Sequence, residues 1–236
     1  MSVLVFVEIK NKLSKAAKEA ITYGKNLGEV NVVTYGNASN KVLSEMGDYG
    51  AKNVWIYKKI NEPNDQVISK LILKAVEKLN AEFILLSQDQ TGKSIGPRVA
   101  AKLVAGHVSG AISLPESSDD FIVKTNVYSG KAIAYVCVHS DKKVISILPN
   151  SIQPVENKVA ASISEFDEDL GNGRIKTVDL KPLGDGIPLP EAELVVSAGR
   201  GLKGPENWGI VEDLAKSLGA TTACSRPVAD IGWRPH

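Results

Sequence analysis

The sequence has few of the residues on which disulfide frameworks and metal centres depend. Its 236 residues include two cysteines, Cys137 and Cys224, and three histidines. Both cysteines lie in apolar, strand-like runs, which argues against a disulfide framework and indicates a reducing compartment. The histidines have no neighbours at ligand spacing, so we expect no metal site.

Long apolar runs and an excess of charge of one sign are also lacking. No stretch approaches the length of a transmembrane helix, and the apolar run at residues 3–7 is too short for a signal peptide and is typical of a strand. The formal net charge of +1 gives no support for binding to nucleic acid or to a membrane surface. We therefore expect a cytoplasmic protein with neither kind of partner.

Familiar catalytic motifs are missing as well. There is no Gly-x-Ser-x-Gly nucleophile elbow, and no cysteine has an obvious base beside it. Residues 90–94, Gln-Thr-Gly-Lys-Ser, resemble the end of an ATP-binding loop, but Ser87 stands where that loop requires its first glycine. The stretch fits the N-cap and first turn of a helix better, and we predict no catalytic residues in the chain.

What the sequence does contain is an alternation of strand and helix patterns. Apolar, β-branched strands are predicted at residues 3–7, 30–35, 53–57 and 83–86, and helices at 12–27, 41–47, 64–79 and 93–103. This order predicts an α/β fold, with a Rossmann-like parallel sheet and helices on both of its faces.

The pattern changes after residue 107, where short apolar runs are separated by turn residues. These runs predict an antiparallel extension of the same sheet, with strands at 108–114, 121–128, 131–138 and 143–148. One further strand is predicted at 159–166 and another at 174–180.

A segment rich in proline and glycine, residues 181–190, predicts a linker. It would separate an N-terminal domain, residues 1–180, from a second unit, residues 191–236. The second unit has the pattern strand 194–198, helix 205–218 and strand 220–224. One strand–helix–strand unit cannot bury both faces of its sheet, so we expect it to be the first part of a larger domain, completed by further chain or by a partner.

The main candidate site lies in this second unit. Gly199-x-Gly201-x-x-Gly204 has the spacing of a dinucleotide-binding loop, with a strand before it and a helix after it. Arg200 and Lys203 place two cations at a helix N-terminus, where they cost stability unless an anion binds. The alternative is a plain tight turn in which the glycines permit positive φ. We favour a phosphate-bearing ligand.

The end of the second strand separates the possible nucleotides. NAD-binding folds carry a carboxylate there to hold the ribose hydroxyls, whereas this chain has Cys224-Ser225-Arg226 and no carboxylate before Asp230. NAD is therefore disfavoured. Arg226 would suit a 2′-phosphate or an electron-rich ring, or would be a solvated loop arginine.

Together these blocks resemble the electron-transfer flavoprotein α-subunit. The resemblance rests on residues 197–207, Ser-Ala-Gly-Arg-Gly-Leu-Lys-Gly-Pro-Glu-Asn, and on residues 225–233, Ser-Arg-Pro-Val-Ala-Asp-Ile-Gly-Trp. It is supported by residues 214–220, by the opening strand and by the Gly-Lys…Pro-Arg helix at 92–103. It extends over essentially the whole chain in order.

The resemblance implies a heterodimer with a β-subunit and a bound FAD, which would take electrons from a dehydrogenase or an NADH-linked donor and pass them on. The N-terminal domain would pack on the β-subunit, and the second would be the start of a flavodoxin-like (DHS-like) FAD-binding domain. Ser225 would hydrogen-bond FAD, and Arg226 would lie beside the isoalloxazine, where its charge would favour the reduced ring. The cofactor-binding residues implied by position are Gly199, Arg200, Gly201, Lys203, Ser225 and Arg226.

In this family the FAD domain continues with Gln-Thr-Gly and Ser-Gly-x-x-Gln-His blocks that also hold the cofactor. This sequence reaches His236 before either block, so we expect only part of the FAD site within it. Two alternatives remain open. One is an assembly module that binds a β-subunit without flavin, and the other is an NADP-dependent enzyme that binds a 2′-phosphate through Arg226.

Overall fold

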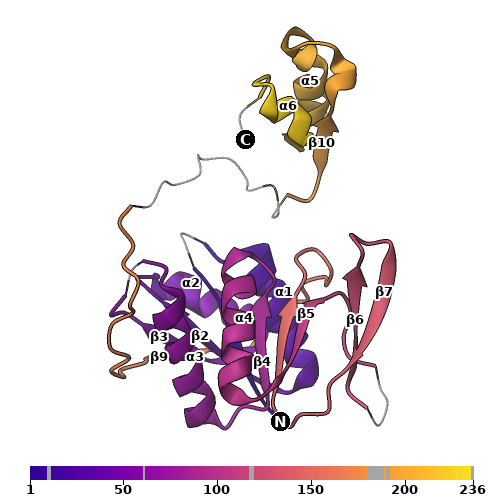
Figure 1. Cartoon of the computed structure of the whole chain (residues 1–236). Helices are drawn as coiled ribbons and strands as arrows, with labels where there is room; N and C mark the ends of the chain where they lie inside the picture. The colour runs from indigo at the N-terminus through magenta and orange to yellow at the C-terminus, as the bar shows by residue number, and fades with distance from the viewer. Residues whose placement is uncertain (10–11, 61, 117–119, 180–188, 190–191, 235–236) are drawn as a thin grey trace. The chain divides into compact units, whose positions relative to one another are not determined.

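The computed structural model describes the chain except for residues 10–11, 61, 117–119, 180–188, 190–191 and 235–236 (Figure 1). It divides into two compact units, Met1–Leu180 and Lys181–His236, which we describe separately. The linker predicted at 181–190 lies almost entirely outside the described residues. No helix in the described part of the chain combines the length and the apolar character needed to cross a membrane.

The first unit is built on a sheet in which nine strands are described, in the order β7-β6-β5-β8-β4-β1-β2-β3-β9. The bounds are β1 (Ser2–Phe6), β2 (Glu29–Tyr35), β3 (Ala51–Tyr57), β4 (Phe83–Ser87), β5 (Gly106–Ala111), β6 (Ile122–Val127), β7 (Ala132–Cys137), β8 (Lys143–Ile147) and β9 (Ser162–Glu165). Neighbouring strands run parallel except for the β5–β6 and β6–β7 pairs, which are antiparallel. The predicted fold class, a parallel α/β sheet with an antiparallel extension, is confirmed.

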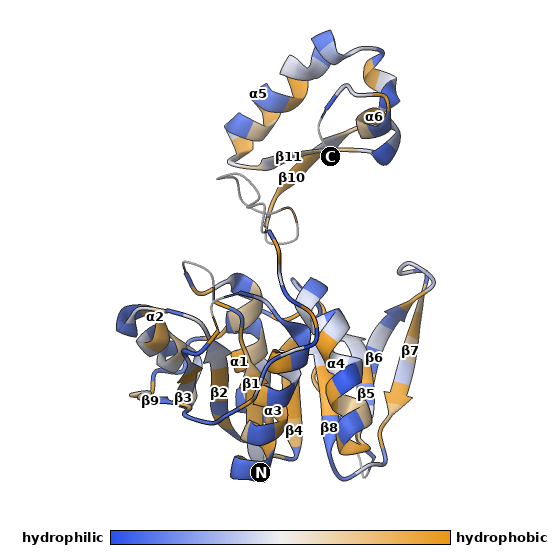
Figure 2. Cartoon of the chain, turned by 60° about the vertical axis from the view of Figure 1, so that its left-hand side comes forward, coloured by the Kyte–Doolittle hydropathy of each residue, from blue (hydrophilic) through white to orange (hydrophobic). Residues whose placement is uncertain are grey.

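Helices cover both faces of this sheet, as predicted. They are α1 (Lys15–Leu27), α2 (Asn40–Glu45) with the 3-10 turn η1 (Met46–Tyr49), α3 (Asp65–Leu79) and α4 (Gln90–Leu103). Alternate residues of β1 divide between the two layers, because successive side chains of a strand point to opposite faces. Val3 and Val5 pack with α1 and α2, whereas Leu4 and Phe6 pack with α3 and α4. In Figure 2 the apolar residues follow the strands, and hydrophilic residues lie on the outer surfaces of the helices.

Side-chain caps fix where the helices begin. The Ser14 hydroxyl accepts the backbone N–H of Ala17 at 3.2 Å, so α1 starts at Lys15, later than predicted. Asp89 Oδ1 accepts the backbone N–H of Gly92 at 2.8 Å, so α4 starts at Gln90, earlier than predicted. Such caps satisfy backbone N–H groups that have no partner within the helix. The stretch that resembles an ATP-binding loop is thus the first turn of a helix, as we expected.

The antiparallel extension is narrower than predicted. Strand β8 was expected within it, but β8 lies between β4 and β5 and runs parallel to both. Its Val144, Ile145, Ser146 and Ile147 are all buried, which is the burial pattern of a central strand covered on both faces. Among the described strands, only β5, β6 and β7 take part in antiparallel pairs.

The segment after β8 returns to the opposite edge of the sheet. The strand predicted at 159–166 is present as β9, parallel to β3. The strand predicted at 174–180 is wrong over its described residues, 174–179, which contain no strand. Side chains near the start of α3 bind this stretch instead, since Gln66 Oε1 accepts the Arg174 N–H at 2.6 Å and Asn64 Nδ2 donates to the Ile175 carbonyl at 2.9 Å.

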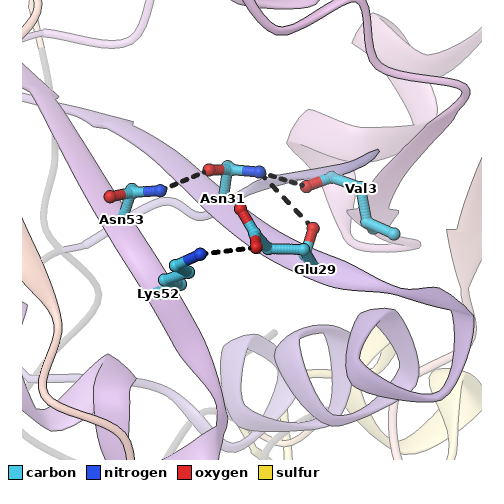
Figure 3. Close-up of polar contacts among 5 residues, drawn as sticks. All are labelled: Val3, Glu29, Asn31, Lys52 and Asn53. Atoms are coloured by element: carbon cyan, nitrogen blue, oxygen red, sulfur yellow. Dashed lines mark hydrogen bonds and ion pairs between the residues drawn. The ribbon is translucent and has the colours of Figure 1, made fainter. Parts of the chain in front are cut away.

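A polar cluster lies within the sheet near the amino ends of its strands (Figure 3). The Asn31 side chain is 2% exposed. Its Oδ1 accepts the Asn53 Nδ2 at 2.8 Å, and its Nδ2 faces the carbonyls of Val3 and Glu29 at 3.5 and 3.4 Å. The pairing of β2 with β3 shifts register just before Asn31, so the asparagine pair marks the register of the two strands.

The second unit contains two parallel strands, β10 (Val195–Ala198) and β11 (Thr221–Cys224), joined through the 3-10 turns η3 (Arg200–Leu202) and η4 (Pro205–Trp208) and helix α5 (Gly209–Leu218). A short helix follows, α6 (Arg226–Asp230), where we had predicted no element. Trp208, Val211 and Val228 form the core and pack against Val196 and Ala198 of β10. Val195, on the other face of that strand, is 44% exposed.

Candidate functional site

The candidate site is built at the point where β10 and β11 end. Ala198 pairs with Cys224 in the parallel register, so both strands stop at the same level. The backbone N–H of Ser225 donates to the Ala198 carbonyl at 3.0 Å, and a Cβ on Gly199 would lie 3.6 Å from Ser225 Oγ. The structure therefore brings together Gly199 and Ser225, two predicted site residues that are distant in sequence. The carboxyl edge of a parallel sheet is where ligands bind in open α/β folds.

The loop after β10 is a tight 3-10 turn. Leu202 N–H donates to the Gly199 carbonyl at 3.2 Å, and Lys203 N–H donates to the Arg200 carbonyl at 3.0 Å. Asn207 Nδ2 donates to the Leu202 carbonyl at 2.7 Å, and this bond links the loop to the turn η4 that follows it. Reasoning from sequence missed this role of Asn207, although the residue follows the last glycine of the motif closely.

The glycines of the loop are not explained by backbone conformation. Gly199 has φ −118° and Gly204 has φ −172°, while the left-handed residue of the loop is Lys203, with φ 68°. Gly201 is likewise outside the left-handed region, and a Cβ placed on it would meet nothing within 4 Å. The loop is a tight turn, as in the alternative, but its glycines do not supply the positive φ that the alternative gave them. At Gly201 neither the turn nor packing among the described residues requires a glycine, so the surface there is open to close approach by a ligand.

Three cationic residues lie close in sequence to these glycines or to Ser225. The side chains of all three are exposed: Arg200, Lys203 and Arg226. Arg226 is the first residue of α6, not a loop residue, and its side chain is 89% exposed. Its Nε lies 3.6 Å from Asp230 Oδ2, one helical turn along. Exposed ion pairs of this kind contribute at most about 1 kcal/mol, so this contact leaves the guanidinium able to turn toward a stronger anion.

Ser225 precedes α6 but does not cap it with its side chain. Its carbonyl accepts the Val228 N–H at 2.8 Å, and no capping bond involves the hydroxyl. The hydroxyl lies instead on the side of Gly199. A serine at an N-cap position that does not use its hydroxyl for capping is a candidate hydrogen-bond donor or acceptor for a ligand.

The two tryptophans of this unit lie in and against its core. Trp208 is buried, and Trp233 packs against it. The Arg234 guanidinium lies over the Trp208 ring, 4.8 Å from its centroid, and also pairs with Glu212. These contacts secure the turn that follows the glycine loop.

The corresponding edge of the first unit is closed where β1 ends. Glu8 lies two residues after the end of β1, and its two carboxylate oxygens accept the Tyr35 hydroxyl at 2.9 Å and the Thr91 hydroxyl at 2.8 Å. Burial, reinforced by the Glu8 charge, raises the pKa of Tyr35 far above its usual value and keeps it a proton donor. A cavity of about 20 Å³ remains beside Glu8 and Ser87, which is space for about one water molecule. The described space beside Glu8 therefore has no room for a nucleotide, whereas a larger cavity of about 550 Å³ lies farther along, between residues 60–67 and residues 171–177.

These features define a class of protein in which an open, cationic strand edge accompanies a larger α/β unit, and comparison with known families identifies the class. Residues 3–196 match the family model "Electron transfer flavoprotein domain", and residues 188–236 match "Electron transfer flavoprotein FAD-binding domain". The chain belongs to the electron transfer flavoprotein family. FAD, the cofactor predicted from the sequence, is confirmed as the cofactor of the domain that residues 188–236 match.

Individual relatives narrow the assignment to the α-subunit type. The chain is 30% identical over 240 residues to the electron transfer flavoprotein subunit alpha of Bacillus subtilis, covering 98% of this chain and 74% of that protein. It is 30% identical over 240 residues to the probable mitochondrial subunit alpha of Caenorhabditis elegans, covering 96% and 69%. These matches confirm the resemblance predicted from the sequence. A third relative, 25% identical over 201 residues, is the lactate dehydrogenase (NAD(+),ferredoxin) subunit LctC of Acetobacterium woodii, covering 80% of this chain and 47% of that protein.

Proposed function

We propose that this chain is the α-subunit of a heterodimeric electron-transfer flavoprotein and acts as an electron carrier without substrate chemistry of its own. The observation that carries the proposal is the open edge at Gly199, Gly201 and Ser225, where neither glycine has a positive φ and a Cβ on Gly201 would meet nothing within 4 Å. This edge lies within the residues that match an FAD-binding domain.

Each predicted site residue would have a definite task. Gly199 and Gly201 would let the cofactor's phosphates approach the backbone, since a side chain there would stand in the way. Arg200 and Lys203 would neutralise the phosphate charge. Ser225 would offer its hydroxyl as a hydrogen-bond partner.

Arg226 would lie beside the flavin ring. When bound, FAD supplies the redox chemistry. The fixed charge of the arginine would favour the electron-rich reduced form over the oxidised form, and so raise the reduction potential. The loose contact with Asp230 supports this role, because the guanidinium is not tied into a buried pair.

The partners follow from the same proposal. Residues 1–180 would form the domain that packs on the β-subunit, residues 181–190 would be the linker, and residues 191–236 would supply one part of the cofactor site. A dehydrogenase or an NADH-linked donor would deliver electrons. The relative named as a subunit of an NAD(+),ferredoxin lactate dehydrogenase supports a donor of that class.

The test is to co-express the chain with its β-subunit, purify the complex with and without added FAD, and measure bound flavin by absorbance and by release on denaturation. We expect a yellow complex. Arg226→Gln should lower the reduction potential, whereas Arg98→Gln, at an exposed arginine of α4 in the other unit, should leave it unchanged.

Each other outcome points elsewhere. A complex with the β-subunit that stays colourless in FAD would refute the carrier and favour the assembly module. If NADPH binds and Arg226→Gln abolishes its binding, the NADP-dependent enzyme would be favoured instead.

A further inference from the structure

The outer ribbon of the first unit, formed by β6 and β7, brings together three side chains of the types that bind metal ions, Asp120, Cys137 and His139. Ile122 of β6 pairs with Cys137 of β7, and the Val138 N–H donates to the Phe121 carbonyl at 3.0 Å, so the pairing continues past the end of β7. In an antiparallel ladder this register sets residue 120 opposite residue 139. Residues far apart in sequence thus become cross-strand neighbours.

The strand alternation then decides which side chains share a face. Val136 and Val138 pack on the hydrophobic core of the sheet. Cys137 and His139 alternate with these valines along the strand. Their side chains therefore point to the opposite face of the sheet. Cys137 is half-buried and His139 is exposed, so both can be reached from solvent.

The distances are those of a metal site before the ion is bound. Cys137 Sγ lies 3.9 Å from His139 Nδ1, and one ligand atom from each of Asp120, Cys137 and His139 lies within 4.8 Å of the other two. Tetrahedral Zn²⁺, with Zn–S of about 2.3 Å and Zn–N of about 2.0 Å, sets sulfur and nitrogen about 3.5 Å apart. Small rotations of side chains at the surface would close that difference.

The three groups also agree in their chemistry. Thiolate, imidazole and carboxylate are the ligands that Zn²⁺ takes in proteins, and three of them leave a fourth position for water. A thiolate among the ligands favours zinc or cobalt over magnesium or calcium, which select oxygen. Both described cysteines are free thiols, so Cys137 is available as a ligand.

We propose that Asp120, Cys137 and His139 form a binding site for one divalent transition-metal ion, with Zn²⁺ as the expected occupant. The site does not depend on the proposed function, since it lies in the first unit and shares no residue with the cofactor site. This proposal departs from our expectation from the sequence, that no metal site exists. Cys137-x-His139 is too short a motif to signal a site, and Asp120 joins it only through the pairing of β6 with β7.

Cobalt titration tests the site directly. The full chain, with its partner subunit if it requires one, is stripped with chelator and titrated with Co²⁺ while the thiolate-to-cobalt charge-transfer band in the near ultraviolet is recorded. We expect one equivalent of Co²⁺ with a clear band, which Zn²⁺ then removes by displacement. Zn²⁺ should also slow alkylation of Cys137 by iodoacetamide and leave the rate at Cys224 unchanged.

Matched variants identify the ligands. Cys137→Ser should abolish the band, while Cys224→Ser, which removes the other cysteine, should leave it intact. Outer partners of metal ligands contribute about 10–100-fold to affinity, so His139→Gln and Asp120→Asn, which remove ligands, should each weaken binding by at least about tenfold. Circular dichroism of the metal-free variants checks that the sheet is preserved.

The proposal is overturned if the unmodified chain shows no charge-transfer band at saturating Co²⁺, or if the band survives Cys137→Ser. It is also overturned if the two ligand variants bind as tightly as the parent chain.

Discussion

The carboxyl edges of the two parallel sheets in this chain end in opposite ways. In the first unit Glu8, Tyr35 and Thr91 close the edge where β1 ends with their own hydrogen bonds, and the space beside Glu8 holds about one water molecule. In the second unit Gly199 and Gly201 leave the edge open, with cationic side chains in the same loop.

The difference shows that topology provides a place for a ligand and side chains decide whether it is used. The first sheet reverses its strand order between β1 and β4, which is the position at which open α/β sheets bind nucleotides. Glu8 puts a carboxylate there, and a phosphate would meet like charge. Fold alone would have favoured the larger unit, whereas the chemistry of the residues favours the smaller one.

The largest expected difference between the two edges comes from substituting one glycine at each of them. A Cβ on Gly92, at the closed edge, would overlap the backbone carbonyl oxygen of Ser87. Because a backbone atom cannot move aside, Gly92→Ala should destabilise the first unit by roughly 2–4 kcal/mol. Gly201→Ala, at the open edge, should change the free energy of unfolding by less than about 1 kcal/mol but reduce FAD retention. Urea titration and flavin content measure the two effects.

Equal loss of stability in the two glycine variants would contradict the distinction between a closed and an open edge. So would a Gly201→Ala protein that keeps its full complement of flavin.

The amino end of the first sheet is also filled by its own side chains, and Asn31 tests how much this matters. Asn31→Ala removes the acceptor of the Asn53 amide inside the sheet and should cost roughly 1–3 kcal/mol. Lys52→Ala, which breaks an exposed ion pair with Glu29 beside it (Figure 3), should cost no more than about 1 kcal/mol. Chemical denaturation of both variants makes the comparison, and similar losses would refute the role of the asparagine pair.

Two serines sharpen the contrast between stability and binding. Ser14 caps α1 through its hydroxyl, so Ser14→Ala should destabilise the first unit by about 1 kcal/mol without changing flavin content. Ser225 does not cap α6, so Ser225→Ala should leave stability nearly unchanged. It should weaken FAD binding by about 5–10-fold, the loss of one hydrogen bond. Thermal melts and flavin titration distinguish these outcomes, and a reversed pattern would exclude Ser225 from the site.

The smallest effect concerns pH and the first unit alone. Burial lowers the pKa of His107 below its ordinary value of 6.5, and its Nε2 lies 3.1 Å from Ser146 Oγ. The unfolded chain therefore binds a proton more readily than the folded chain, so stability should fall as the pH drops through about 6.5. Glu19, whose pKa is raised by burial, has the opposite sign at lower pH, because its folded form favours the proton.

His107→Gln should flatten the dependence of the urea midpoint on pH between about pH 7.5 and pH 5.5. A slope equal to that of the parent chain would exclude His107 as its source.

Sequence patterns located most of the elements, because the alternation of apolar residues follows directly from burial on one or both faces. They could not give the place of β8, since an apolar run says that a strand is buried and not which strands lie beside it. Side-chain partners decided other details. Asp89 caps α4, so the helix starts earlier than predicted. Gln66 and Asn64 form hydrogen bonds with the backbone at residues 174–175, in place of the bonds that a neighbouring strand would have made.

The strand and turn that carry the predicted cofactor residues could be located from the sequence, because they lie in one motif. Their surroundings could not. The open space at Gly201, the hold of Asn207 on the loop and the helix that begins at Arg226 all depend on contacts between separate segments. The same is true of Asp120, Cys137 and His139, which meet only through the register of two strands.

The pairing of β9 with β3 bears on how the protein is made. Asn53 pairs with Ser162, more than a hundred residues later, and Phe166 packs on Trp55 with ring centroids 5.5 Å apart. During synthesis, the outer side of β3 therefore stays uncovered until the ribosome has released residue 166. Before that moment the nascent chain exposes a strand edge and an aromatic surface that a chaperone could bind. The last strand of the first unit is thus the step that ends its exposure, just before the cofactor-binding segment emerges.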